Sequence, residues 1–133
     1  MKPRILIAAS IVLAAVALAS CSSSSATLET VAPETAAQVI ADNPDAVVLD
    51  IRTPEEFAAG FIEGAVNIDF YASDFTARLD QLDKGTEYVV YCRSGNRSGE
   101  AMGMFADLGF ETVTEIDGGI VNWYESGFPV VAE

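Results

Sequence analysis

Short apolar runs alternate with amphipathic stretches along most of the chain, from Leu28 onward. Runs rich in β-branched and aromatic residues predict strands, and apolar residues that recur at a spacing of three to four predict helices. The expected strands are 46–51, 67–70, 87–91 and 111–116. The expected helices begin at Pro33 and Pro54, span 73–82 and 98–108, and end with a short helix from Ile120. Strands that alternate with helices predict an α/β fold, a mostly parallel sheet of about five strands covered on both faces.

The helix that follows the first apolar run has a clear start and end. Thr53 can cap its N-terminus, Pro54 suits the first helical position and Glu56 completes a capping box. Gly60 can close it. We therefore expect this helix to be anchored directly behind the end of the strand at 46–51.

The first twenty residues have a different pattern. Lys2 and Arg4 precede an uncharged apolar run, 5–20, that is shorter than a comfortable transmembrane helix. It ends in "LASC", which resembles the lipobox of bacterial lipoproteins. The resemblance implies that residues 1–20 are a signal peptide, that Cys21 is lipidated, and that the protein is extracytoplasmic and held on a bacterial membrane, on its periplasmic or cell-surface side. The alternatives are an ordinary signal peptide with a chance cysteine, or a retained anchor.

The remaining chain divides into a tether and one domain. Residues 21–27 are serine-rich and polar, and read as a flexible tether of about 10–15 Å mean reach. Residues 28–133 form the expected single domain, without internal repeats. Its formal charge argues against nucleic acid or an anionic membrane surface as partner, because the whole chain carries −13 and no histidine.

The stretch "VVYCRSGNRS" carries the candidate chemistry. Cys92 comes directly after a strand expected to end at Tyr91, the place where sites gather in open α/β sheets. The loop that follows can turn its backbone N–H groups inward, aided by Gly95 and by the start of a helix near Ser98. Of seven basic residues, two lie in the first twenty, and Arg93 and Arg97 are two of the other five.

These features favour a thiolate at Cys92 and an anionic substrate. Cationic neighbours and helix N-termini lower the pKa of a cysteine, and without a histidine this activation has to be electrostatic. The competing interpretation is an inert buried cysteine with two surface arginines. A Cys21–Cys92 disulfide is possible only if Cys21 is not lipidated. No metal-ligand cluster and no cofactor are expected.

Three segments resemble the single-domain rhodanese family of sulfurtransferases. They are "VVLDIRTPEEFAAGFIEGAVNID", "VVYCRSGNRS" and "DGGIVNWYESGFPV", and their order and spacing cover nearly the whole of 28–131. The resemblance implies a three-layer rhodanese-like fold and a reaction in which a sulfane sulfur moves from thiosulfate or a similar donor, through a Cys92 persulfide, to a thiol or cyanide acceptor.

The same resemblance implies roles for individual residues. Cys92 is the sulfur-carrying nucleophile. The substrate-binding loop consists of Arg93, Ser94, Gly95, Asn96, Arg97 and Ser98, whose backbone amides would cradle the terminal sulfur while the arginines orient the anion. Asp50 and Arg52 would support the loop as an ion pair at the edge of the core. Gly118, Gly119 and Trp123 match the last segment, where Trp123 is expected in the core.

Two other functions remain open. A tyrosine phosphatase needs an arginine at the sixth position after its cysteine, whereas Arg97 is the fifth after Cys92. Related phosphatases and arsenate reductases have a loop one residue longer. The loop length therefore argues against a phosphatase and against an arsenate reductase. The other alternative is a non-enzymatic extracytoplasmic module that carries sulfur, senses redox state or binds a partner.

Overall fold

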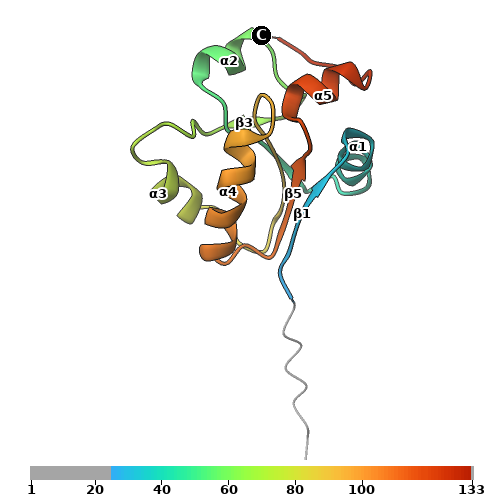
Figure 1. Cartoon of the computed structure of the whole chain (residues 1–133). Coiled ribbons are helices and arrows are strands. Elements are labelled where there is room, and N and C mark those ends of the chain that lie inside the picture. The colour runs from blue at the N-terminus through green and yellow to red at the C-terminus, as the bar shows by residue number, and fades with distance from the viewer. Residues whose placement is uncertain (1–24, 133) are drawn as a thin grey trace, which may run out of the picture.

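The computed structural model describes residues 25–132, in which strands and helices alternate along the chain (Figure 1). The strands are β1 (Thr27–Val31), β2 (Val47–Asp50), β3 (Val66–Asn67), β4 (Glu87–Tyr91) and β5 (Thr112–Ile116). The helices are α1 (Pro33–Asp42), α2 (Pro54–Ala59), α3 (Phe75–Asp80), α4 (Asn96–Asp107) and α5 (Gly119–Glu125). The expected helices are all present, with ends that differ by a few residues, and so are three of the expected strands. The strand expected at 67–70 is shorter and lies earlier, at Val66–Asn67.

The strands form one parallel sheet in the order β1-β5-β4-β2-β3. This confirms the predicted α/β fold. The edge strand β1 was not expected as a strand, and its first residue, Thr27, lies in the segment assigned to the tether. Thr27 is opposite Thr112 in β5, and its N–H donates to the carbonyl of Glu111 at 2.7 Å.

Helices cover both faces of the sheet, as Figure 1 shows for α3 and α4 on one side and α1 on the other. On the α4 side the core contains Leu79, Phe105 and Phe110. On the opposite side, Ala36 of α1 packs with Ile120 and Trp123 of α5. The central strand β4 is buried on both faces, as expected for a parallel strand between two helical layers.

Two local features position the functional loop. The capping box of α2 is formed as predicted: the Glu56 N–H donates to the Thr53 hydroxyl at 3.3 Å, and the Thr53 N–H donates back to the Glu56 carboxylate at 3.1 Å. The Gly60 N–H closes this helix on the carbonyl of Phe57. Helix α4 begins at Asn96, two residues before the expected start, because Gly95 adopts a left-handed φ of 101° as its N-cap.

The N-terminal predictions fall largely outside the described residues. The signal peptide 1–20 and the lipidation site Cys21 are not within 25–132, so both stay predictions. Among the helices of 25–132, none has the length and apolar character needed to cross a bilayer.

Candidate active site

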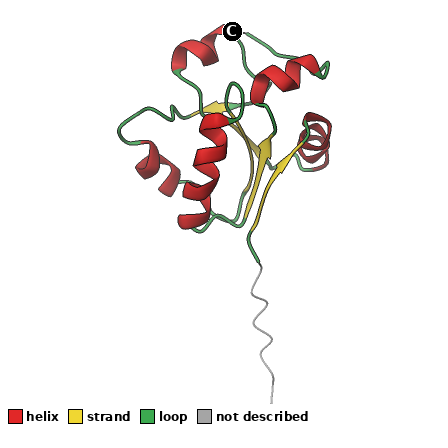
Figure 2. Cartoon of the chain, viewed as in Figure 1, coloured by secondary structure: helices red, strands yellow, loops and turns green. Residues whose placement is uncertain are grey.

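Cys92 lies at the carboxyl edge of the sheet, directly after the central strand β4. Its exposed fraction is 1 %. The loop to α4 is drawn in green in Figure 2, at the same end of the molecule as α2 and α5. This is the position at which open α/β sheets place their sites. Within 25–132, no group of three or more cysteine or acidic side chains forms a potential metal site.

The Cys92 sulfur is surrounded by hydrogen-bond donors from its own loop. The Gly95 N–H donates to Sγ at 3.1 Å, and the Ser98 hydroxyl oxygen lies 3.3 Å from Sγ. Burial disfavours the thiolate, but hydrogen bonds from the Ser98 hydroxyl and from the backbone amides of Ser98, Gly95 and Ser94 outweigh it and lower the pKa of Cys92. The loop therefore supplies the inward-facing amides that the sequence predicted.

Arg93 and Arg97 contribute less to the lowered pKa of Cys92 than the sequence suggested. Neither is among the largest interactions that stabilise the thiolate. Arg97 is turned towards α2, where its two terminal nitrogens donate to the two carboxylate oxygens of Glu56 at 2.7 and 2.8 Å. Its guanidinium also lies over the ring of Tyr71, 5.4 Å from the centroid. The bidentate hydrogen bond lowers the pKa of Glu56 to about 2 and raises that of Arg97.

Glu56 thus has two functions, of which the sequence indicated only one. The capping box was readable because its members are three residues apart. The ion pair with Arg97 joins residues 41 apart in the chain, so no local pattern reports it. The other polar side chains of the loop, Arg93, Ser94 and Asn96, are exposed at the rim of the site.

Asp50 and Arg52 form the predicted ion pair at the end of β2. Both are buried, and Arg52 Nη2 lies 2.6 Å from Asp50 Oδ2. The same nitrogen donates to the carbonyl of Gly60 at 2.6 Å, which ties the end of α2 to the sheet. The Asn67 side-chain amide adds hydrogen bonds to the carbonyls of Asp50 and Arg52. This pair holds the strand β2 and helix α2 together beside the loop.

The start of α5 contacts the backbone of the loop. The N–H groups of Ile120 and Val121 donate to the carbonyls of Cys92 and Arg93 at 2.9 and 3.2 Å. Gly119 has a φ of +62°, and a Cβ there would lie 2.4 Å from the Cys92 carbonyl oxygen. The sequence singled out this glycine as part of a motif, but not its contact with the backbone of Cys92.

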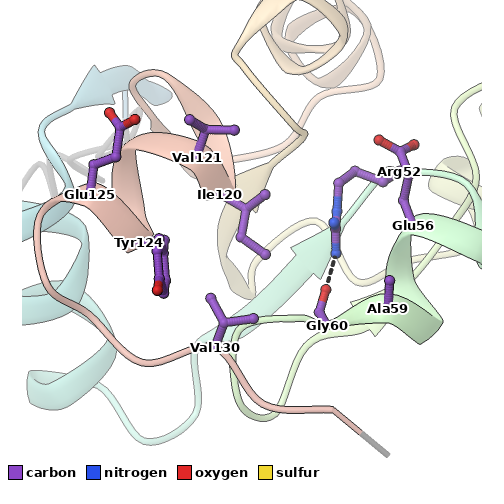
Figure 3. Close-up of a pocket in the computed structure, with 9 residues that line it drawn as sticks. All are labelled: Arg52, Glu56, Ala59, Gly60, Ile120, Val121, Tyr124, Glu125 and Val130. Carbon is purple, nitrogen blue, oxygen red and sulfur yellow. Dashed lines mark hydrogen bonds between the residues drawn. The ribbon is translucent and has the colours of Figure 1, made fainter.

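A pocket of about 350 Å³ lies between residues of α2 and α5 (Figure 3), and none of the residues 92–98 lines it. Its walls are mostly apolar, with Ile120 and Val130 beside Tyr124. Arg52 also borders it, but its guanidinium is bonded to Asp50 and to the Gly60 carbonyl seen in Figure 3. Trp123 lies elsewhere, buried with its indole N–H donating to the Pro129 carbonyl at 3.0 Å, as expected for a core residue.

Known proteins resemble both the sequence and the fold. Residues 32–126 match the family described as "Rhodanese-like domain". The chain is 36% identical over 99 residues to a sulfurtransferase of Allochromatium vinosum, covering 74% of this chain and 91% of that protein. It is 41% identical over 98 residues to the thiosulfate sulfurtransferase GlpE of Pseudomonas aeruginosa, covering 73% and 84%. A crystal structure of a rhodanese-related protein from Thermoplasma volcanium superposes with a TM-score of 0.67 at 33% identity, covering 78% of this chain and 98% of that one.

Proposed function

The chain belongs to the rhodanese-like domain family, and we propose that it is a sulfurtransferase in which Cys92 carries the transferred sulfur as a persulfide. The observation that carries this proposal is the sulfur of Cys92 itself. It is buried at the end of the central strand, accepts a hydrogen bond from the Gly95 N–H and has a lowered pKa. The relatives named thiosulfate sulfurtransferases support thiosulfate as the donor.

The reaction proceeds in two displacements at sulfur. The Cys92 thiolate attacks the outer sulfur of thiosulfate, a bond forms between the two sulfurs, and the bond to the sulfonate sulfur breaks. Sulfite leaves with that electron pair, and Cys92 holds a persulfide anion. A thiolate or cyanide then attacks the terminal sulfur, and the electron pair of the breaking S–S bond returns to Cys92 as the thiolate. Atoms and charge balance in both steps.

The loop stabilises the negative charge that stays on sulfur throughout. The backbone amides of Ser94 and Gly95 point at the position of Sγ, and donors held in place before the reaction need no reorganisation. Arg93 is exposed at the rim, where its charge attracts an incoming dianion. Arg97 adds a weaker field, because Glu56 offsets its charge.

A phosphatase function is disfavoured by the same geometry. The side chain that would have to hold a phosphate is Arg97, which is the fifth residue after Cys92 and is bonded to Glu56 through both terminal nitrogens. We therefore expect no turnover of an aryl phosphate. A module that only binds or senses would leave Cys92 without a transferable sulfur, and a sulfur-transfer assay separates it from an enzyme.

The test is thiosulfate-to-cyanide sulfur transfer by the full-length protein. Cys92→Ser keeps the size of the side chain and replaces the nucleophilic sulfur, so we expect thiocyanate formation to fall to background. Cys21→Ser is the matched control, because it makes the same change at the other cysteine, and it should keep the activity of the unchanged protein. Activity retained by Cys92→Ser would refute the proposal.

We also propose that the protein is lipid-anchored through Cys21, outside the cytoplasm of a bacterium. The support is the charge and hydropathy pattern of residues 1–21 alone. Cells that express the chain should incorporate labelled fatty acid into it, and Cys21→Ser should abolish the label. Labelling that persists in this variant would contradict the anchor.

A further inference from the structure

Glu115 is a buried carboxylate that the proposed reaction has not used. It lies in β5 with an exposed fraction of 4 %. Its Oε1 accepts a hydrogen bond from the Ser98 hydroxyl at 2.5 Å, and its Oε2 accepts one from the Thr30 hydroxyl at 2.7 Å. Thr30 belongs to β1, the strand beside β5 in the sheet (Figure 1). Within 25–132, no lysine or arginine lies within ion-pair distance of it. A buried carboxylate without a cation is costly, which is why such groups gather at functional sites.

Ser98 connects this carboxylate to the reactive sulfur. Its oxygen lies 2.5 Å from Glu115 Oε1 and 3.3 Å from Cys92 Sγ, and all three side chains are buried. A serine hydroxyl has one proton, and an ionised carboxylate can only accept. While Glu115 is ionised, the Ser98 proton is therefore directed at Glu115. The proton between Ser98 and Cys92 must then be that of the thiol.

The thiolate requires the opposite arrangement. A negative sulfur is stabilised when the Ser98 hydroxyl donates to it, and the Ser98 proton is then no longer available to Glu115. Glu115 fits this second arrangement when it carries a proton and donates to the Ser98 oxygen. In the first arrangement the two protons belong to Cys92 and Ser98, and in the second they belong to Ser98 and Glu115. Both arrangements have the same net charge.

We propose that Glu115 accepts the proton of the Cys92 thiol through the Ser98 hydroxyl. The S–H bond of Cys92 breaks and its proton passes to the Ser98 oxygen, while the hydroxyl proton of Ser98 passes to Glu115 Oε1. The electron pair of the S–H bond stays on sulfur as the thiolate, and Glu115 becomes neutral. Glu115 touches neither substrate nor sulfur, so it is a positioning residue. In a chain without histidine, it supplies the base that the loop lacks.

This inference rests on Cys92 being the nucleophile, but its test does not require sulfur transfer. When two groups share one proton, they titrate in two steps that belong to the pair. The rate of alkylation of Cys92 by iodoacetamide, read by peptide mass spectrometry on the full-length protein, should therefore rise in two steps with a plateau between them. In Glu115→Gln, which cannot take the proton, the profile should show a single step.

Neighbouring charges do not add a step to this profile. Arg97 stays protonated throughout, because its hydrogen bond to Glu56 raises the pKa of its guanidinium. Glu56 has its pKa lowered to about 2 by Arg97, below the range of the measurement. Tyr91 is the last residue of β4 and directly precedes Cys92. Burial raises the pKa of its phenol, which therefore stays neutral. A second step therefore reports the carboxylate coupled to Cys92.

Two further variants separate proton transfer from a structural role. Thr30→Val removes the other hydrogen bond of Glu115 at an exposed position, and it should keep two steps with shifted midpoints. Ser98→Ala interrupts the chain and should give one step. A single step in the unchanged protein, or the same two steps in Glu115→Gln, would overturn the inference, and persulfide formation on Cys92 in the same preparation would show that the proposed function stands without it.

Discussion

Replacement of Gly119 by alanine is expected to disable the loop without touching any side chain of the site. The residue has a φ of +62°, which strains an alanine by roughly 1–2 kcal/mol. The new Cβ would also lie 2.4 Å from the Cys92 carbonyl oxygen and 2.6 Å from the carbonyl of Arg93, whereas ordinary contacts begin at 3.4 Å. The backbone of Cys92 must therefore retreat by roughly 1 Å.

Such a displacement is large for a reacting atom. A shift of about 1 Å can reduce the rate about 100-fold, and overpacking against backbone adds about 1–3 kcal/mol to the loss of stability. Gly109→Ala is the matched control, because Gly109 has a similar φ of +83° but nothing within 4 Å of the position that an alanine methyl would occupy. Gly109→Ala should lower the free energy of unfolding only by the strain of the left-handed backbone, and the variant should keep its activity.

The assay combines urea unfolding with the rate of thiosulfate-to-cyanide transfer for both alanine variants. We expect Gly119→Ala to be the less stable by the overpacking energy and to have kcat/KM about 100-fold below that of Gly109→Ala. Equal kcat/KM in the two variants would refute the reasoning, because it would show that contact between the β5–α5 turn and Cys92 does not hold the sulfur in position.

The remaining predictions concern the ion pairs and the cap around the loop. Arg97 lowers the pKa of Glu56 to about 2, below its ordinary value, so the stabilisation is present above about pH 4.5 and is lost as the pH falls towards 2. Glu56→Gln should accordingly lower the unfolding free energy by about 1 kcal/mol at pH 7 and hardly at all near pH 2, measured with urea at both values; an equal loss at both would be contrary to this assignment. Asp50→Asn leaves Arg52 charged and buried, and urea unfolding should show a loss of about 3–5 kcal/mol, against about 1 kcal/mol for Thr53→Ala in the α2 cap. A smaller loss for Asp50→Asn than for Thr53→Ala would contradict the buried pair.

Local sequence patterns predicted most of the fold. The apolar run ending at Tyr91 and the capping box from Thr53 to Glu56 depend on neighbours within a few residues, and both occur as expected. The edge strand β1 was missed because it is mostly exposed, so its hydropathy does not distinguish it from the polar segment before it. Its partner β5, which supplies the register, is 85 residues away along the chain.

The sequence predicted which residues form the site better than it predicted the ion pairs and hydrogen bonds among them. The strand end and the composition of the loop indicated Cys92 and its amide donors. They could not indicate that Arg97 bonds to Glu56 or that Glu115 reaches Ser98, because each contact joins elements that meet only in the folded chain. Counting charges along the sequence therefore overestimated how much the arginines stabilise the thiolate. In the structure, hydrogen bonds to the sulfur provide most of that stabilisation.

The most direct test of the central claim is the mass of Cys92 after treatment with thiosulfate. Full-length protein incubated with thiosulfate, freed of excess donor and digested without reductant should yield a Cys92 peptide heavier by about 32 Da, the mass of one sulfur. Addition of cyanide should restore the original mass and release thiocyanate. An unmodified Cys92 after thiosulfate treatment, in protein that remains folded, would contradict the account.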